Sequence, residues 1–374
     1  MNVLLIPDAF KDSLSSSEVA SAMRRGVLAE HPDANIFHIT ASDGGEGFLE
    51  SVRQYLPNAE VIVCKTVDPL GRPLEASYLI DRDNNVAYIE LAKASGLELL
   101  KPEDRNPLFT STKGTGVQIA DAIRRGMKTI YLGIGGSATN DAATGIVSAL
   151  GFKFSDESGD LLDPCGNMLG EVSAIEKPVS LPEDLKFYAI NDVLNPLYGP
   201  EGAAFTYAKQ KGASTAEIKL LDAGLQNISE VIRSTYGMDH SDVPGSGAAG
   251  GTAYGLKAFL NAEYISGVSF LLKLAKFNEL VDSEGIDLIL TGEGCIDSQT
   301  AYGKLVSGVA NEARLHNIPV MAVCGKLNLN KDEVRKLGMF AADEIYRPDQ
   351  PEGYSYSHAA SLISKRTVEL LSQL

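Results

Sequence analysis

The chain alternates between short apolar segments and longer stretches in which apolar residues recur at helical spacing. The short segments have the length and the β-branched content of buried strands, and the longer stretches have the pattern of amphipathic helices. The predicted strands include Val3–Ile6, Ile36–Ile39, Thr129–Leu132, Phe187–Ile190, Asp287–Leu290 and Val320–Val323. The predicted helices include Ser15–Glu30, which opens with a capping-box sequence, Val117–Arg125, Lys304–His316 and Ser357–Leu371. This alternation predicts an α/β fold in which helices cover both faces of a parallel sheet.

Residues 61–100 depart from this alternation. The segments Val61–Lys65, Leu74–Ile80 and Val86–Leu91 have the pattern of strands, and turn sequences rather than helices join them. A β-rich segment inside an α/β chain indicates an inserted second domain. The length of 374 residues agrees with two domains, because one hydrophobic core rarely organises so many residues.

The charge of the chain restricts what it can bind. It has 33 Lys and Arg residues against 49 Asp and Glu residues, which gives a net charge of −16. Nucleic acids and anionic membranes need a basic surface, so neither is an expected partner. A phosphorylated ligand would need compensation from backbone N–H groups, a few lysines and a divalent cation.

The remaining bulk features favour a cytoplasmic protein. Its cysteines are Cys64, Cys165, Cys295 and Cys324, which form no C-x-x-C pair. Reduced thiols are therefore expected, rather than disulfides or a zinc site. The sequence has no secretory leader pattern, and no window approaches the roughly 20 apolar residues of a membrane span.

A glycine loop, Gly133–Asp141, is the strongest candidate for ligand binding. It follows a predicted strand and precedes a predicted helix of small residues, Ala142–Leu150. Backbone N–H groups at Gly135 and Gly136 can converge on a phosphate, and the Asn-Asp pair at 140–141 adds a cap and a contact for Mg²⁺. The alternative interpretation is a tight turn followed by an ordinary helix cap.

Acidic residues stand at the ends of several other predicted strands. Ligands bind beyond the carboxyl ends of strands in doubly wound sheets, so these positions are candidates for chemistry. They are Asp8, Asp43 within Asp-Gly-Gly-Glu-Gly, Asp192 and Glu293. Each one alone is explained by a helix cap or an Asx turn, but their repetition at equivalent positions favours function.

Residues 291–300 form a second loop with the character of a ligand site. Glu293 and Asp297 supply the carboxylate oxygens that Mg²⁺ prefers. Lys304 follows at the start of the next predicted helix, where a cation is unfavourable unless an anion is bound. Lys11, in the loop after the first strand, is placed to hold a carboxylate or a phosphate. For both lysines the alternative is a solvated surface cation.

Several signatures of nucleotide binding and hydrolysis are absent from the sequence. It contains no G-x-x-x-x-G-K-[ST], no H-R-D or D-F-G, and no G-x-S-x-G. Gly245–Gly250 fits G-x-G-x-x-G, but no predicted strand precedes it, so NAD binding is not expected. The small residues from Gly247 to Gly255 would let a helix approach another backbone or a ligand closely.

The ordered set of motifs closely resembles the bacterial class I glycerate kinase family over essentially the whole chain. The blocks that carry the resemblance are Pro7–Ser15, Asp43–Gly47, Ala94–Leu97, Gly114–Gly116, Gly133–Asp141, Asn191–Leu197, Gln210–Ala213, Pro244–Gly251 and Thr291–Lys304. The resemblance implies a kinase that uses ATP and Mg²⁺ to phosphorylate D-glycerate, in this class typically at O2, with 3-phosphorylation as the open alternative. It also implies a flavodoxin-like doubly wound parallel sheet domain, interrupted by an inserted α/β domain with a mixed sheet. We expect these to be residues 1–62 with 283–374 and residues 63–282, with the active site between them.

The candidate residues then take expected roles. The residues expected to hold ATP phosphates are Gly135, Gly136, Ser137, Asn140, Asp141 and Lys304. Those expected to hold Mg²⁺ are Asp192, Glu293 and Asp297. The residues expected to act on glycerate are Lys11, with Asp8 orienting it, and Asp43 or Asp192 as the base that takes the hydroxyl proton. Two other functions stay open, a kinase for another small hydroxy acid and a non-catalytic nucleotide-binding regulator, and the chain is expected to be a monomer or a homodimer.

Four positions depart from the family pattern. Cys295 stands where Arg is common, Ala142 and Ala143 replace Gly-Gly, Asn191 stands where Cys is frequent, and Ser246 stands where Ala is. Without the arginine, the loop at Glu293 lacks one strong contact for an anion.

Overall fold

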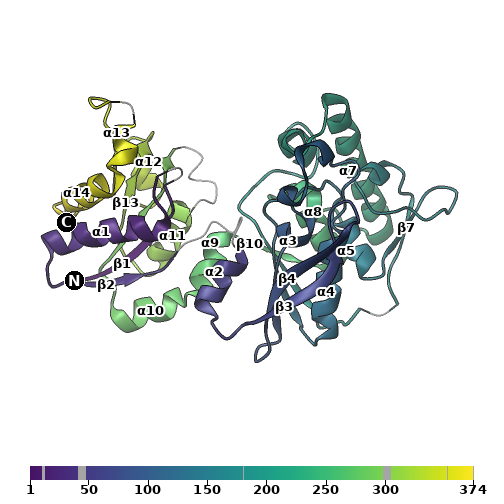
Figure 1. Cartoon of the computed structure of the whole chain (residues 1–374), viewed down its shortest axis with the longest axis horizontal. Helices are drawn as coiled ribbons and strands as arrows, with labels where there is room; N and C mark the ends of the chain where they lie inside the picture. Colours follow the sequence, from purple (N-terminus) through teal and green to yellow (C-terminus); the bar gives the residue numbers. More distant parts are fainter. Residues whose placement is uncertain (11–12, 41–47, 180, 298–304, 352, 374) are drawn as a thin grey trace. The chain divides into compact units, whose positions relative to one another are not determined.

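The computed structural model describes residues 1–10, 13–40, 48–179, 181–297, 305–351 and 353–373. The chain forms two compact units (Figure 1). Unit 1 comprises residues 1–43 and 266–374, and unit 2 comprises residues 44–265. These units divide the chain at other positions than the expected 62/63 and 282/283, because the helix at 48–55 packs on a strand of unit 2 and the helices at 267–284 pack within unit 1.

Unit 1 is built on a five-stranded parallel sheet with the order β15-β13-β11-β1-β2. Its strands are β1 (Asn2–Pro7), β2 (Asn35–His38), β11 (Leu288–Gly292), β13 (Val320–Cys324) and β15 (Ala341–Glu344), and β12 (Cys295–Ile296) pairs with β14 (Lys326–Leu327) beside them. Its helices are α1 (Ser16–Glu30), α9 (Gly267–Leu274), α10 (Phe277–Glu284), α11 (Leu305–Leu315), α12 (Lys331–Lys336), α13 (Tyr354–Ser357) and α14 (Ala359–Leu371). If these five strands are numbered 1 to 5 in chain order and the sheet is followed from the β2 edge, their order is 2-1-3-4-5. This is the flavodoxin-like order.

Both faces of this sheet are buried. Val3 and Leu288 on one face pack with Met23 of α1 and Ile363 of α14. Leu4, which alternates with Val3 along β1, is fully buried as well, so the opposite face is also covered. Burial on both faces explains why the strands are near-continuous apolar runs in the sequence.

The start of α1 confirms the capping box. Ser15 is the N-cap, its hydroxyl accepts from the N–H of Glu18, and the Glu18 carboxylate accepts from the N–H of Ser15 at 2.8 Å. This reciprocal pair satisfies two N–H groups that a helix leaves unpaired at its start.

Unit 2 contains a six-stranded mixed sheet with the order β10-β9-β6-β5-β4-β3. Its strands are β3 (Glu60–Val67), β4 (Pro73–Asp81), β5 (Val86–Glu90), β6 (Thr129–Gly133), β9 (Lys186–Ile190) and β10 (Glu263–Ile265), with β7 (Lys153–Ser155) and β8 (Ala174–Glu176) as a separate pair. Its helices are α2 (Phe48–Tyr55), α3 (Ala92–Ser95), α4 (Lys113–Arg124), α5 (Thr144–Ala149), α6 (Ala203–Tyr207), α7 (Thr215–Tyr236) and α8 (Ala248–Leu260), with short 3₁₀ turns at Leu97–Leu99, Pro102–Asp104, Asn167–Gly170 and Lys209–Lys211. The three strands predicted at residues 61–91 are β3, β4 and β5, and they pair antiparallel.

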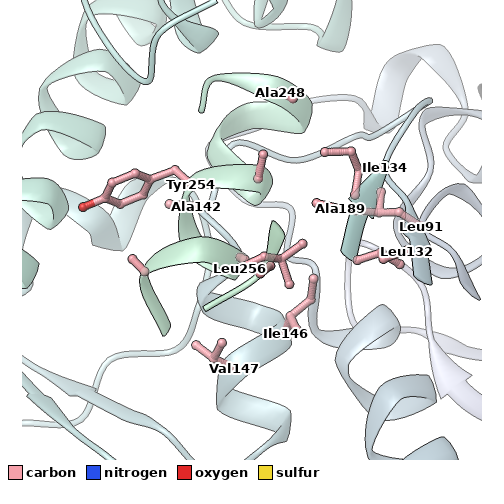
Figure 2. Close-up of a cluster of buried hydrophobic side chains, with 14 of the residues drawn as sticks. Leu91, Leu132, Ile134, Ala142, Ile146, Val147, Ala189, Ala248, Tyr254 and Leu256 are labelled. Carbon is pink, nitrogen blue, oxygen red and sulfur yellow. The ribbon is translucent and has the colours of Figure 1, made fainter. Parts of the chain in front are cut away.

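The core of unit 2 supports the end of β6. Figure 2 shows Leu132 and Ile134, from β6 and the residues after it, gathered with Ile146 of α5 and Leu256 of α8. A Cβ on Gly255 of α8 would lie 1.9 Å from the carbonyl oxygen of Ala142, so the α8 backbone packs directly against the chain that precedes α5. The predicted close approach of this small-residue helix is therefore confirmed.

Two helices begin at other residues than predicted. α4 begins at Lys113 rather than Val117, and it includes Gly116, where a Cβ would lie 2.5 Å from the carbonyl oxygen of Ile146. Glycine is a weak helix former, so the sequence gives little sign of this first turn. α5 covers only Thr144–Ala149, because Ala142 and Ala143 have left-handed backbones with φ of 49° and 59°. No helix in the described ranges is both long enough and apolar enough to cross a bilayer.

Candidate functional site

The loop that follows β6 presents backbone N–H groups that the rest of the described chain does not use. The N–H of Leu97 donates to the carbonyl of Gly136 at 2.9 Å, and the N–H of Ala138 donates to the carbonyl of Ser95 at 2.9 Å. These bonds hold the loop through the carbonyl of Gly136 and the N–H of Ala138. No hydrogen bond among the described residues uses the N–H groups of residues 135–137, and Gly136 is exposed with φ of 70°. Such a turn can present several N–H groups to one anion.

Lys211 fixes the same loop from within unit 2. Its ammonium Nζ donates to Ser137 Oγ and to the carbonyl oxygen of Thr139, each at 2.7 Å. The residue is only 4% exposed. Burial lowers the pKa of Lys211 to about 7, and the nearby Asp141 carboxylate opposes this shift. The sequence predicts no role for Lys211, and only its place in the block Gln210–Ala213 marks it.

Asp141 is fully buried, and its carboxylate accepts hydrogen bonds from residues at the starts of two helices. Its Oδ2 accepts from the N–H and the hydroxyl of Thr112, both at 2.8 Å, and from the N–H of Gly145 at 3.3 Å. Burial raises the pKa of the Asp141 carboxyl, and the Thr112 bonds act in the opposite direction. Asp141 thus joins the start of α4 to the start of α5, in addition to the ligand role that the sequence suggested.

Several buried polar atoms beside the loop have no hydrogen-bond partner among the described residues. They are Thr139 Oγ1, Asn140 Oδ1 and Nδ2, Asp141 Oδ1 and Asn191 Nδ2. Asn140 is 1% exposed, so both ends of its amide are removed from bulk water without compensation. Unpaired buried polar groups are costly and concentrate where a ligand or an ordered water is bound.

Residues with left-handed backbones lie beside these unpaired polar atoms. Ala249, Gly250 and Gly251 have φ between 54° and 80° near the start of α8, and the N–H of Ala142 donates to the carbonyl of Gly250 at 3.2 Å. The left-handed residues of this turn therefore meet the left-handed pair Ala142–Ala143. Left-handed alanines persist only where surrounding contacts impose them, and such strain is common at functional sites.

The end of β9 lies next to the end of β6 in the sheet, and it carries Asn191 and Asp192. Residues Gly133 and Ile190 are register partners, so the glycine loop and Asp192 leave neighbouring strands at the same edge. Asp192 is half-buried. The sheet therefore brings Gly135, Gly136, Ser137 and Asp192 to one end of unit 2, as the sequence predicted for ligand sites in such sheets.

In unit 1, Asp8 and Glu293 follow neighbouring strands. Pro7 and Gly292 are register partners, and the N–H of Asp8 donates to the carbonyl of Gly292 at 2.8 Å. Glu293 is 6% exposed, which is unusual for a carboxylate without a specific role.

The loop after β12 contains the other predicted acid of unit 1. Asp297 is half-buried, and the thiol of Cys295 donates to Asp297 Oδ2 at 3.8 Å. The side chain beside Asp297 in this loop is therefore a weak thiol donor. The hard oxygen donors Glu293 and Asp297 stand four residues apart in one loop of unit 1, and they suit Mg²⁺ by their chemistry.

Part of the predicted site is not described. Lys11, Asp43 and Lys304 lie outside the described residues. Within the ranges that the structure does describe, no group of three or more His, Cys, Asp or Glu side chains is arranged to hold a metal ion. Asp192 belongs to unit 2 whereas Glu293 and Asp297 belong to unit 1, so their joint role in binding Mg²⁺ stays a prediction.

A surface pocket of about 410 Å³ lies elsewhere in unit 1. It is lined by Ser269, Leu272, Lys273, Lys276, Phe277, Asn278, Glu279 and Glu312. None of the predicted site residues lines it. Its polar and apolar groups are mixed, and it has no counterpart among the predicted roles.

Comparison with known proteins gives one consistent family. The sequence pattern that defines the Glycerate kinase family matches residues 3–374. A protein of Halalkalibacterium halodurans named glycerate kinase is 41% identical over 345 residues, which cover 91% of this chain and 90% of the relative. A protein of Escherichia coli K12 named glycerate 2-kinase is 40% identical over 348 residues, which cover 92% of this chain and 90% of the relative.

A solved structure extends the similarity to three dimensions. The crystal structure of a protein from Salmonella typhimurium LT2, described as a glycerate kinase 2, superposes with a TM-score of 0.79 at 33% identity. The match covers 100% of this chain and 98% of that chain.

Proposed function

The chain belongs to the glycerate kinase family, and on that premise we propose that it transfers the γ-phosphoryl group of ATP to D-glycerate and forms 2-phosphoglycerate. The choice of ATP follows from the kinase family. The choice of the 2-phosphorylated product is supported by the relative that is named a glycerate 2-kinase. Formation of 3-phosphoglycerate is the alternative that product analysis must separate. The cytoplasmic location and the place of the reaction between two domains stay predictions.

The observation that carries the proposal is the set of unused N–H groups at residues 135–137. In a chain with a net charge of −16, these amides offer positive dipoles without adding lysines. We propose that they hold phosphate oxygens of ATP. Asn140, with both ends of its buried amide unpaired, and Asp141, which fixes the chain after the loop, complete this subsite.

The acidic residues at the strand ends suit a divalent cation. We propose that Glu293 and Asp297, together with Asp192, hold Mg²⁺. When bound, the ion neutralises phosphate charge, which is the main requirement of phosphoryl transfer. Asp192 or Asp43 would accept the proton of the glycerate hydroxyl, and Lys11 and Lys304 would steady glycerate or the γ-phosphate, with Asp8 orienting Lys11.

The test is the release of ADP from ATP in the presence of Mg²⁺ and D-glycerate, with the product identified by ³¹P NMR. We expect turnover that depends on D-glycerate, and a 2-phosphoglycerate signal. Glu293→Gln and Asp192→Asn should each lower kcat/KM about a hundredfold, because each removes a required charge. Glu284→Gln, at the exposed end of α10, is the matched control and should change kcat/KM less than about twofold.

Each other outcome has a definite meaning. Turnover with another small hydroxy acid but not with D-glycerate would support the alternative substrate. Binding of ATP without release of ADP with any acceptor would support a non-catalytic regulator. Activity of Glu293→Gln and Asp192→Asn within a few-fold of the wild type would refute the proposed metal ligands and leave the kinase activity standing.

A further inference from the structure

Lys211 is an unusual lysine, because its charged end is buried and, among the described residues, bonds only to the loop after β6. It ends the 3₁₀ turn Lys209–Lys211 and is 4% exposed, whereas Lys209, two residues earlier, is exposed. Its Nζ bonds to Ser137 Oγ and to Thr139 O connect segments more than 70 residues apart. Lysines are rarely buried unless they are paired. The two bonds therefore set the position of the loop.

The donor capacity of Lys211 exceeds what the described residues use. A charged ammonium has three N–H donors, and two of them are directed to Ser137 and Thr139. A neutral amine has two N–H donors, so it would be satisfied by these oxygens alone. The third donor of the charged form has no acceptor among the described residues.

The surroundings of Lys211 leave its charge only partly compensated. Asp141 is the carboxylate that acts on it, and the adjoining helix α6, with the sequence Ala-Ala-Phe-Thr-Tyr, carries no charged side chain. The backbone carbonyl of Arg105 lies against Gly212, the residue that follows Lys211. With a pKa of about 7, Lys211 carries a proton in only part of the molecules at neutral pH. An anion at the loop would favour the charged form.

We propose that Lys211 is a positioning residue that holds the phosphate-binding loop through Ser137 and Thr139, and that it gains a proton when an anionic ligand occupies that loop. This inference rests on the proposed function, in which the anion is a phosphate group of ATP. No proton acceptor or donor other than solvent is required, because the proton taken up by Lys211 comes from the buffer. The site thereby gains a positive charge only when it is loaded.

Lys211→Met is the informative variant. Methionine keeps the length and the apolar stem, and it removes the cost of burying an amine. We expect this variant to stay folded with a lower thermal unfolding temperature, because Ser137 Oγ and the carbonyl oxygen of Thr139 lose their donor. Its Kd for Mg²⁺·ATP should rise about tenfold or more, because the loop loses two fixed bonds and a charge. Lys209→Met is the matched control and should bind Mg²⁺·ATP within about twofold of the wild type.

Two further measurements separate positioning from general stability. Ser137→Ala should weaken binding, and Lys211→Met combined with Ser137→Ala should be no weaker than Lys211→Met alone, because both changes break the same contact. Calorimetric titration with Mg²⁺·ATP at about pH 8, in two buffers of different ionisation enthalpy, should show proton uptake by the wild type that Lys211→Met lacks. A purely structural lysine would not produce that difference.

The outcomes distinguish this inference from the proposed function. Equal affinity and equal proton uptake in the wild type and Lys211→Met would overturn the inference while leaving kinase activity intact. If Lys211→Met does not fold, a Ser137→Ala variant that binds like the wild type would overturn it. A wild type that binds Mg²⁺·ATP through Lys211 but never phosphorylates glycerate would overturn the proposed function alone. A wild type that binds no nucleotide would overturn both.

Discussion

The carboxylate of Asp141 accepts two hydrogen bonds from Thr112, one from the backbone N–H and one from the hydroxyl, each at 2.8 Å. The Thr112 hydroxyl in turn accepts from the N–H of Ile146 at 3.0 Å. One side chain thus links the start of α4, the loop after β6 and the first turn of α5. All three groups are buried, so none of these bonds can be exchanged for bonds to water.

Thr112→Val should therefore destabilise the protein strongly for an isosteric change. It leaves a buried carboxylate oxygen and the N–H of Ile146 short of a partner, and the free energy of unfolding should fall by about 2 kcal/mol or more. Thr112→Ser keeps the hydroxyl and should cost less than about 1 kcal/mol, the value of one buried methyl group. Urea unfolding followed by circular dichroism measures both. Equal losses for the two variants would contradict the role of the hydroxyl.

A methyl group at Gly136 should affect nucleotide affinity beyond its effect on stability. Gly136 has φ of 70°, and Gly71, in the turn between β3 and β4, has φ of 80° with room for a Cβ. Gly136→Ala and Gly71→Ala should each cost about 1–2 kcal/mol of unfolding free energy through left-handed strain. Only Gly136→Ala should also raise KM for ATP, by about tenfold, because it distorts the N–H groups of the loop. Steady-state kinetics with varied ATP measure KM for both variants. Equal KM values in the two variants would count against the loop as the phosphate site.

The buried amine of Lys211 predicts how stability depends on pH. Burial lowers its pKa from 10.5 to about 7, so above pH 7 the folded chain has released a proton that the unfolded chain still holds. The unfolding free energy should therefore rise with pH from about 7 upward, by up to about 1.4 kcal/mol per pH unit from this group. Below pH 7 both states carry the proton and the contribution is constant.

Comparison with Lys211→Met isolates that contribution, since all other groups are shared. The difference in unfolding free energy between wild type and variant, from urea titrations at about pH 7, 8 and 9, should grow in favour of the wild type as pH rises. A difference that does not change with pH would show that Lys211 titrates normally.

Ala143 should tolerate glycine better than an ordinary buried alanine does. Its φ of 59° is strained for alanine, so Ala143→Gly relieves about 1 kcal/mol while losing a similar amount of methyl burial and chain entropy. We expect a change in unfolding free energy within about 1 kcal/mol. Ala122→Gly, in the buried interior of α4, has no strain to relieve and should lose about 1–2 kcal/mol. Thermal unfolding compares them, and equal losses would contradict the strain.

The sequence predicted those elements whose signals are local. α1 follows from Ser15 and Glu18, which make the capping box. The strands of both sheets follow from their apolar runs except β10 and β15, short edge strands that were not predicted. The predicted start of α5 at Ala142 was wrong, because nothing in the local sequence indicates that Ala142 and Ala143 adopt the left-handed backbone. The contacts of Ala142 with Gly250 and Gly255, more than 100 residues away, impose it.

The site shows the same division between local and distant causes. The glycine loop was visible because Gly135 and Gly136 are adjacent in sequence and follow a strand. Lys211 was missed because a lysine in a polar segment is normally solvated, and only the fold reveals that its ammonium bonds to Ser137. The second role of Asp141 was hidden for the same reason, since its partner Thr112 lies in another element.

A crystal structure of the protein with Mg²⁺, D-glycerate and a non-hydrolysable ATP analogue tests the role of the loop after β6 most directly. We expect phosphate oxygens of the analogue within hydrogen-bond distance of the N–H groups of Gly135, Gly136 and Ser137. A nucleotide whose phosphates contact none of these three N–H groups would contradict that role.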